Sequence, residues 1–414
     1  MASVPLHLSW RPKAPWALRL GPAFGAGDVE ASPPASRIPR HLEARRRTLW
    51  QSGHWPLGFR PRTALRLALC LPYVALALWC ARRGIDSPTN VAIARQGASV
   101  RWGSSQLSWI GDAYPPVPVA IASLVPGGAT LLGVAGALCA GGMLQMVWER
   151  LVRAGLPWWV IAPVLAGLGG TPVFWFVATQ DLVGFVGMAL FTIALAGLLD
   201  FVLRARTAGG FTAGLALALA VLTDPAALVY AASVFVAAPL LVLGRLGRDR
   251  AALRSALAVI VFPALAAACG WAFFQWRFTG VPFHLPAVAP SMFRFPAGVV
   301  APLRDALVGV GKATAYSPLF LLSAVLLLRR RPLAFAAYLL VPIDLVLTLW
   351  LGLRVSDGQS LVLMNLVAVF SLPTRPGRTT RGLIVAAALA QVAIWCTAVL
   401  GHGAIAPWLH ALTA

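Results

Sequence analysis

The stretch LVGFVGMALFTIALAGLLDFVL at residues 182–203 decides the class of fold, because its only charged residue is Asp200. At about 1.5 Å per residue, a helix of this length can cross the roughly 30 Å hydrocarbon core of a bilayer. Comparable apolar runs recur from residue 63 to the C-terminus. Lipid offers backbone groups no hydrogen-bond partner, so each run is expected to be helical. The sequence therefore predicts an all-α, polytopic transmembrane helical bundle.

The composition agrees with this interpretation. The chain has 414 residues, of which 59% are hydrophobic and 11% are charged. An ordinary soluble domain carries about 25% charged residues. A chain with so little polar surface cannot cover itself in water, and we expect the membrane to be its solvent.

Apolar runs bounded by charges, Pro or Gly predict about eleven spans. Residues 1–60 contain no such run and are rich in Pro, Arg, Ser and Gly, so they are predicted to form a flexible basic cytoplasmic tail, with residues 61–414 as the transmembrane domain. The predicted spans cover residues 63–80, 129–148, 157–177, 182–203, 210–224, 225–243, 255–276, 313–328, 333–353, 358–372 and 383–400.

The charge distribution predicts the orientation. With the tail in the cytoplasm, most of the 34 Lys and Arg residues fall on the cytoplasmic side, which is the positive-inside pattern. The N-terminus is then cytoplasmic and the C-terminus extracytoplasmic. This arrangement explains the net charge of +21 without nucleic acid and leaves membrane lipids as partners of the tail. The preference for Arg over Lys, with abundant Ala, Gly and Pro, suggests a bacterial protein of the plasma membrane.

Two outer segments are too long to be simple turns, residues 81–128 and 277–312. The first contains PTNVAIARQGASVRW and YPPVPVAIASLVPGG, which are predicted to form short interfacial helices because Pro begins them and Gly ends them. The apolar stretch 210–243 is too long for one crossing and has basic loops at both ends, so it is predicted to cross the membrane twice. Its break, Thr223-Asp224-Pro225, is then at a hairpin tip near the outer surface. Short helices with a polar tip often line a cavity.

Two carboxylates have unusual predicted positions. Asp86 follows Arg82-Arg83 at the outer end of the first span, where it suits a general base near a lipid headgroup; the alternative is a helix-capping residue before Ser87-Pro88. Asp344 lies in the middle of the ninth span, where a carboxylate costs roughly 2.5–3.5 kcal/mol on insertion scales. It is expected to face a cavity or a cation, and a structural partnership with an Arg is an equal alternative.

The order of these segments resembles the GT-C glycosyltransferases, membrane enzymes that use polyprenyl-phosphate sugars. The resemblance covers about residues 63–372. It rests on a set of segments in this order: GIDSPTNVAIARQG, SWIGDAYPPVPVAIASLVPGG, VWERLVRAGLP, TPVFWFVATQD, GLALALAVLTDPAAL and WRFTGVPFH.

The resemblance implies inverting transfer of a sugar from a polyprenyl-phosphate donor to an extracytoplasmic glycan or lipid acceptor. It makes Asp86 the candidate base and Asp112 the second acidic residue near substrate. The remaining candidates would bind substrate: the acidic Asp181 and Asp224, the cations Arg294, Lys312 and Arg354 against the phosphate, and Tyr114, His284 and Gln359 as hydrogen-bonding partners of sugar. Each cation can equally be an interfacial anchor.

No metal or cofactor is predicted, because the six histidines are scattered and form no ligand pair at helical spacing. Two other functions remain open. In a transporter, Asp344 and Asp224 would line an ion or substrate path, although no inverted repeat is recognisable. A non-catalytic membrane scaffold of the same fold is the other alternative.

Overall fold

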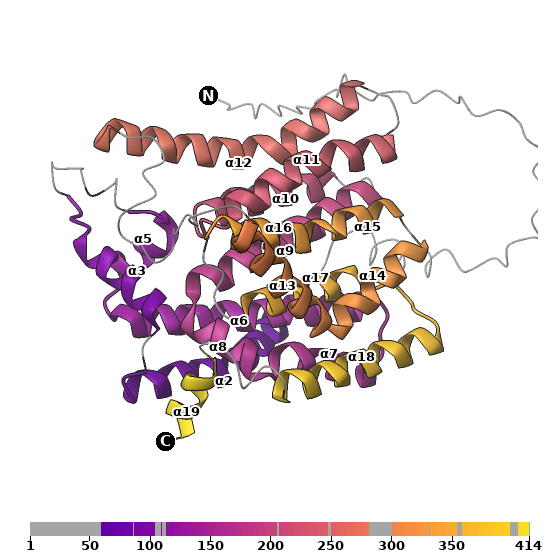
Figure 1. Ribbon diagram of the computed structural model, residues 1–414, viewed down its shortest axis with the longest axis horizontal. Coiled ribbons are helices and arrows are strands. Elements are labelled where there is room, and N and C mark those ends of the chain that lie inside the picture. The colour runs from indigo at the N-terminus through magenta and orange to yellow at the C-terminus, as the bar shows by residue number, and fades with distance from the viewer. Residues whose placement is uncertain are drawn as a thin grey trace, which may run out of the picture. The chain divides into compact units, whose positions relative to one another are not determined.

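Every regular element that the structure describes is a helix (Figure 1). The computed structural model describes residues 59–85, 87–103, 109, 113–204, 207–246, 250–280, 300–330, 332–353, 358–397 and 405–413, so nearly all of the predicted tail lies outside it. The helices are α2 (Phe59–Arg82), α3 (Pro88–Ser99), α5 (Pro116–Leu124), α6 (Gly128–Arg153), α7 (Trp158–Gly169), α8 (Pro172–Gln180), α9 (Leu182–Arg204), α10 (Thr207–Val221), α11 (Ala227–Leu246), α12 (Arg250–Thr279), α13 (Val300–Ala315), α14 (Pro318–Arg330), α15 (Pro332–Tyr338), α16 (Leu340–Trp350), α17 (Gln359–Ser371), α18 (Arg378–Thr397) and α19 (Ile405–Thr413).

The prediction of an all-α protein is confirmed, whereas the count of eleven spans is not. Within the described residues, five helices are long and apolar enough to cross a membrane, or up to seven if each sharply bent pair is one span. The five are α2, α6, α9, α12 and α18, and the bent pairs are α7 with α8 and α13 with α14. Four of the predicted spans are instead shorter apolar stretches, in α10, in α11, in α15 with α16, and in α17. These findings are consistent with a membrane protein.

Proline explains the bend of 55° between α7 and α8. Pro172 has no backbone N–H, so the helix cannot continue through it and one carbonyl of the preceding turn loses its partner. That carbonyl, of Leu168, accepts a hydrogen bond from the hydroxyl of Thr171 at 3.1 Å. The next carbonyl, of Gly169, accepts from the hydroxyl of Tyr73 at 2.6 Å and the indole of Trp175 at 2.7 Å. The break is therefore satisfied by side chains within the bundle, as an apolar environment requires.

Small residues allow α2 and α6 to pack closely and antiparallel. A methyl group added at Gly141 of α6 would lie 2.5 Å from the Cβ of Cys70 in α2, so only glycine fits there. Towards the other end of the pair, a methyl group added at Gly133 of α6 would lie 3.7 Å from the Cβ of Ala77 in α2. Residues later in α2 therefore contact residues earlier in α6, which means that the two helices run antiparallel. Close approach over small residues is the usual way in which membrane helices associate.

Helix α9 is central, and α2, α12 and α18 are peripheral. In its most apolar stretch α9 has 72% of its residues buried, compared with 22%, 17% and 22% for α2, α12 and α18. It packs against α6, α8, α10, α11 and α17. Helices α12 and α18 lie at opposite edges of the bundle (Figure 1). The break before α9 is therefore held among several other helices.

The two short helices predicted in residues 81–128 are present as α3 and α5. The Oγ of Ser87 caps α3 by accepting a hydrogen bond from the backbone N–H of Thr89 at 3.2 Å. The two helices pack tightly, because a methyl group at Gly97 would lie 2.6 Å from the Cβ of Ala122. In the second predicted outer segment, α13 begins at Val300, so part of that segment is helical.

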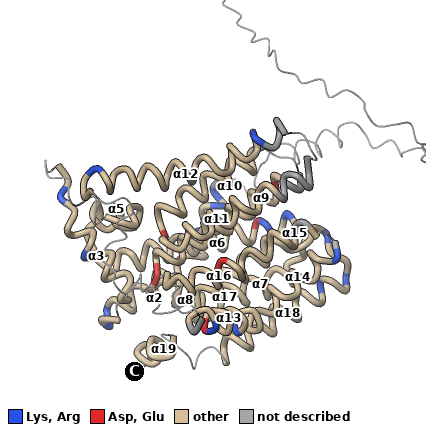
Figure 2. Tube along the Cα trace, turned by 45° about the horizontal axis from the view of Figure 1, so that its top comes forward, with Lys and Arg blue, Asp and Glu red and all other residues tan. Residues whose placement is uncertain are grey.

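Charge is sparse along the described chain, and basic positions gather at the ends of helices (Figure 2). The few acidic positions lie mostly among the helices (Figure 2). This separation directs attention to the buried acidic residues, because a buried carboxylate is expensive without a partner.

Candidate functional site

The structure describes some of the predicted site residues and not others. Asp86, Asp112, His284, Arg294 and Arg354 lie outside the described residues. Tyr114, Asp181, Asp224, Lys312 and Gln359 are described, as is Asp344.

Asp181 occupies the break between α8 and α9. Its Oδ1 accepts a hydrogen bond from the backbone N–H of Gly184 at 3.0 Å, which caps the start of α9. Asn90 of α3 binds the same break on both sides: its Nδ2 donates to the Thr179 carbonyl at 3.4 Å, and its Oδ1 accepts from the Leu182 N–H at 3.3 Å. Both polar side chains are buried. The first outer segment is thereby attached to the start of the central helix.

Asp224 occupies the break between α10 and α11, which confirms the predicted hairpin break. Its Oδ1 accepts a hydrogen bond from the backbone N–H of Ala226 at 2.9 Å. Its Oδ2 is buried and has no hydrogen-bond partner among the described residues. An unsatisfied buried acceptor costs about 1–3 kcal/mol, so this oxygen is suited to receive a hydroxyl of a bound molecule or of water.

Tyr114 connects the first outer segment to the same hairpin. Its hydroxyl donates to the backbone carbonyl of Val221, the last residue of α10, at 3.1 Å. Burial, and to a smaller extent the charge of Asp224, raises the pKa of Tyr114 above its ordinary value. The phenol therefore stays protonated and remains a hydrogen-bond donor.

Glycines on α9 bring these residues together. A methyl group at Gly184 would lie 2.4 Å from Nε2 of Gln359 and 2.5 Å from Oδ2 of Asp181. One turn later, a methyl group at Gly187 would lie 2.4 Å from Oδ2 of Asp224. The charges of Asp181 and Asp224 lie within electrostatic range of each other. Tyr114, Asp181, Asp224 and Gln359 thus converge at the start of α9, which we call the α9 polar junction.

A small hollow that is partly open to solvent lies beside this junction. Asn90 lines the hollow and also bonds the α8–α9 break, whereas none of the four residues of the junction lines the hollow. Ile85 and Ser87, the chain neighbours of Asp86, line it as well. The space inside it that a water-sized sphere can reach is about 10 Å³, so it has room for about one water molecule and is much smaller than a typical ligand pocket. The polar side chains in its wall are Ser87, Asn90, Thr130, Thr179 and Gln180.

Lys312 does not join the α9 polar junction. It is exposed in the last turn of α13, and no hydrogen bond or ion pair connects it to Asp181, Asp224 or Gln359. Of the three cations that were predicted to face the donor phosphate, the structure describes Lys312, and Arg294 and Arg354 lie outside the described residues.

Asp344 is fully buried in α16, as its predicted mid-span position suggested. The hydroxyl of Ser233 in α11 donates a hydrogen bond to its Oδ1, and within the described part of the chain its Oδ2 has no hydrogen-bond partner. No Lys or Arg within the described residues forms an ion pair with it. The alternative of an Arg partner is therefore not supported within those residues. Tyr230 of α11, whose hydroxyl is buried and unpartnered, lies within electrostatic range of both Asp344 and Asp224.

Sequence reasoning missed Asn90, Gly184 and Gly187. Asn90 did leave a signal, because it lies on one face of α3 with the buried residues Ile93, Gln96 and Gly97. A polar residue at the spacing of an apolar helical face indicates a buried hydrogen-bonding role. Gly184 and Gly187 left no such signal in the sequence, because apolar helices contain many glycines. Only the residues that pack against a glycine show whether it permits close approach.

The described residues contain no group of three His, Cys, Asp or Glu side chains placed to hold a metal ion. The candidate site is therefore defined by hydrogen-bonding groups around a helix start. Comparison of the chain with protein-family models, with curated proteins and with solved structures finds no match.

Proposed function

We propose that this chain is a membrane glycosyltransferase that moves a sugar from a polyprenyl-phosphate donor to an extracytoplasmic glycan or lipid acceptor. The observation that carries the proposal is the α9 polar junction with the adjoining hollow, whose wall includes both chain neighbours of Asp86. Carboxylates, an amide and a phenol in one buried place suit a ligand rich in hydroxyl groups. The resemblance of the segment order to GT-C enzymes supports the same function.

In this proposal the reaction is an inverting displacement. The acceptor hydroxyl attacks the anomeric carbon, the carboxylate of Asp86 takes the hydroxyl proton, and the polyprenyl phosphate leaves with the bonding electrons. Asp112 stands near substrate, while Asp181, Asp224, Tyr114, Gln359 and His284 hydrogen-bond the sugars. Arg294, Lys312 and Arg354 stabilise the phosphate that leaves.

The proposal includes a topology of about eleven spans in the plasma membrane, with a cytoplasmic N-terminus and an extracytoplasmic C-terminus. The short helices α10, α11 and α17 would then cross as part of a locally thin or tilted bundle. Accessibility of single engineered cysteines to a membrane-impermeant thiol reagent tests this arrangement residue by residue.

The decisive experiment is Asp86→Asn in the purified protein with a radiolabelled lipid-linked sugar. Loss of a general base is expected to lower turnover by a factor of about 10² or more. Asp305→Asn is the matched control, because Asp305 lies in the predicted outer segment 277–312 and is exposed on α13. Undiminished transfer by Asp86→Asn, with an unchanged elution profile, would show that Asp86 is not the base.

One observation favours a second candidate, a proton-coupled transporter. Asp344 is buried in α16 with an unpartnered Oδ2, and buried ionisable residues in membrane helices often carry protons. In proteoliposomes, uptake driven by a pH gradient without any lipid-linked donor, and lost in Asp344→Asn, would favour transport. Sugar transfer that survives Asp344→Asn would favour the transferase.

A further inference from the structure

Three buried oxygen atoms around α11 have no hydrogen-bond partner among the described residues. They are Oδ2 of Asp224 at the α10–α11 break, the hydroxyl oxygen of Tyr230 in α11 and Oδ2 of Asp344 in α16. Tyr230 and Asp344 are 0% exposed, and Asp224 is 5% exposed. A buried polar group without a partner is costly, so each of these atoms calls for an explanation.

The packing of α9 places Asp224 beside Tyr230. Gly187 and Phe191 lie four residues apart and therefore on one face of α9. A methyl group at Gly187 would lie 2.4 Å from Oδ2 of Asp224. The ring of Phe191 stacks on the ring of Tyr230 with centroids 4.5 Å apart. Successive turns of one helix face thus contact first the carboxyl group and then the phenol.

The packing of α11 places Tyr230 beside Asp344. Tyr230 and Ser233 lie three residues apart on one face of α11, and the hydroxyl of Ser233 donates to Oδ1 of Asp344. The phenol lies within electrostatic range of both Asp224 and Asp344. Tyr230 therefore lies between the two carboxyl groups.

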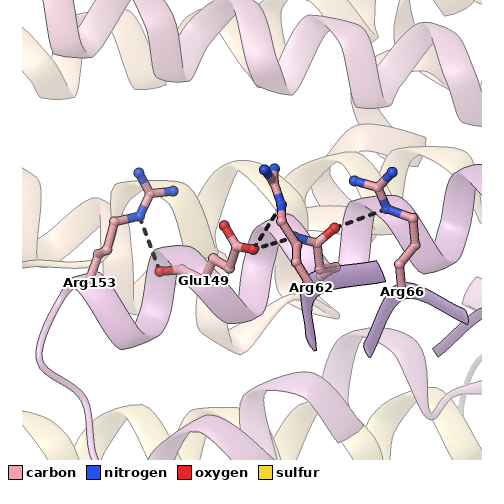
Figure 3. A network of polar contacts seen from close by, with 5 residues as sticks. Arg62, Arg66, Glu149 and Arg153 are labelled. Atoms are coloured by element: carbon pink, nitrogen blue, oxygen red, sulfur yellow. Dashed lines mark hydrogen bonds and ion pairs between the residues drawn. The ribbon is translucent and has the colours of Figure 1, made fainter. Parts of the chain in front are cut away.

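A buried carboxylate elsewhere in the protein is neutralised by a cation. Glu149 of α6 has a side chain that is 0% exposed, and its Oε1 forms an ion pair with Nε of Arg62 at 3.2 Å. Arg66 and Arg153 belong to the same network of polar contacts (Figure 3). Glu149 can therefore keep its negative charge inside the bundle.

No such cation is found near Asp344 in the described part of the chain. Helix α16 packs against α11, α13, α15 and α17. The charged side chains that the structure describes on these helices, Arg304, Asp305 and Lys312, are all exposed on α13. A buried carboxyl group without a counter-ion is neutral only when it binds a proton.

We propose that Asp344 holds an exchangeable proton, and that the hydroxyl of Tyr230 and bound water pass this proton to and from Asp224. In one exchange, the carboxylic acid of Asp344 releases its proton towards the oxygen of Tyr230. The phenol releases its own proton on the other side, and the carboxylate of Asp224 takes up a proton. Tyr230 ends neutral, and one proton has moved from Asp344 to Asp224.

This path connects the interior of the bundle to the α9 polar junction, because Asp224 belongs to both. It rests on neither sugar transfer nor transport, since proton exchange needs no substrate. A protein that fails to transfer sugar can therefore still support or contradict it.

The test is the exchange of the Asp344 proton for deuterium, followed by infrared spectroscopy of the full chain in lipid vesicles. A protonated carboxyl group has a carbonyl-stretch band that shifts when deuterium replaces the proton. We expect this band in the unaltered protein and its loss in Asp344→Asn, which assigns it. If Asp344→Asn does not fold, Asp344→Glu assigns the band by moving it. Absence of the band from the unaltered protein would overturn the proposal.

Tyr230→Phe tests the relay, and Tyr338→Phe is the matched control. Both tyrosines are buried and stack on a phenylalanine at 21°, with ring centroids 4.5 and 4.4 Å apart. The hydroxyl of Tyr338 is hydrogen-bonded to Ser323 and to the Phe320 carbonyl, unlike that of Tyr230. Tyr230→Phe is expected to slow the deuterium exchange about tenfold, because it removes a bridging hydrogen bond. Tyr338→Phe should leave the rate unchanged.

Exchange in Tyr230→Phe at the rate of the unaltered protein would overturn the path. Equal slowing by both tyrosine variants would also overturn it, since that result reports a general change in packing. If Tyr230→Phe does not fold, Asp224→Asn interrupts the path at its other end and keeps an oxygen for the N–H of Ala226. It is expected to slow exchange to a similar extent, and unslowed exchange would contradict the proposal.

Discussion

The most apolar stretches of α9 and α12 have almost the same mean hydropathy but opposite burial. In its most apolar stretch, α9 has 72% of its residues buried inside the protein, whereas α12 has 17%. Apolar composition therefore indicates that a segment prefers a membrane, but it does not indicate whether the segment faces lipid or protein.

The neighbours of glycine explain the difference. On α9, a methyl group at Gly197 would lie 2.7 Å from the backbone carbonyl oxygen of Gly209 in α10, so the two helices are in backbone contact. On α12, a methyl group at Gly270 would meet nothing within 4 Å. Helix α12 instead exposes large side chains such as Phe262 and Phe273. Helix α12 also has one close neighbour, because a methyl group at Gly214 of α10 would lie 2.5 Å from the backbone carbonyl oxygen of Val259 in α12. Helix α9 is central because several helices pack around it, whereas the side of α12 that carries Phe262 and Phe273 is exposed.

The largest expected effect comes from removing an aromatic ring from each helix. Phe191 of α9 is fully buried and stacks on Tyr230 with ring centroids 4.5 Å apart, whereas Phe262 of α12 is 69% exposed. Phe191→Ala should lower the free energy of unfolding by about 4 kcal/mol because it leaves a cavity. Phe262→Ala should lower it by less than about 1 kcal/mol. Chemical unfolding in detergent measures both, and equal losses would contradict the assignment of α9 as central.

A smaller effect is expected from adding one methyl group. Gly197→Ala should lower the free energy of unfolding by about 2 kcal/mol, because the backbone of α10 must move away. Gly270→Ala meets open space and improves helix propensity, so it should be neutral or stabilising by up to about 1 kcal/mol. Thermal unfolding of the two variants in one detergent is the measurement. A destabilised Gly270→Ala would indicate an unseen partner of α12.

The smallest effect concerns the start of α9. Asp181 caps this helix through the N–H of Gly184, so Asp181→Ala should lower the free energy of unfolding by about 1 kcal/mol. Asp305→Ala, at an exposed aspartate of α13, should change it by less than about 0.5 kcal/mol. The same unfolding measurement compares them. If Asp181→Ala is neutral, the break is held by Asn90 alone.

Local features of the fold could be predicted from local sequence. Helices formed at the predicted apolar runs, α3 and α5 formed where proline begins a short segment, and the hairpin broke at Thr223-Asp224-Pro225. The number of spans could not be predicted in the same way. Pro172 and Pro318 bend apolar runs by 55° and 87°, and hydropathy does not say whether a bent pair crosses once.

The candidate site was predictable in part. Tyr114, Asp181 and Asp224 stood out as polar residues at breaks between apolar runs, and the structure brings them together with Gln359 at the start of α9. The sequence did not predict that Asn90 would bond the same break. It gave no sign that Lys312 would stand apart, because exposure on α13 depends on how that helix is rotated.

The sequence alone determined that this chain forms apolar helices with polar breaks, because lipid satisfies no backbone group and each helix must satisfy its own. Only the tertiary structure decided which faces are buried, which breaks meet, and that Arg62 pairs with Glu149 across α2 and α6. Those contacts join residues far apart in the chain. They depend on the rotation and register of packed helices, which are set by the fit of side chains against one another and not by hydropathy.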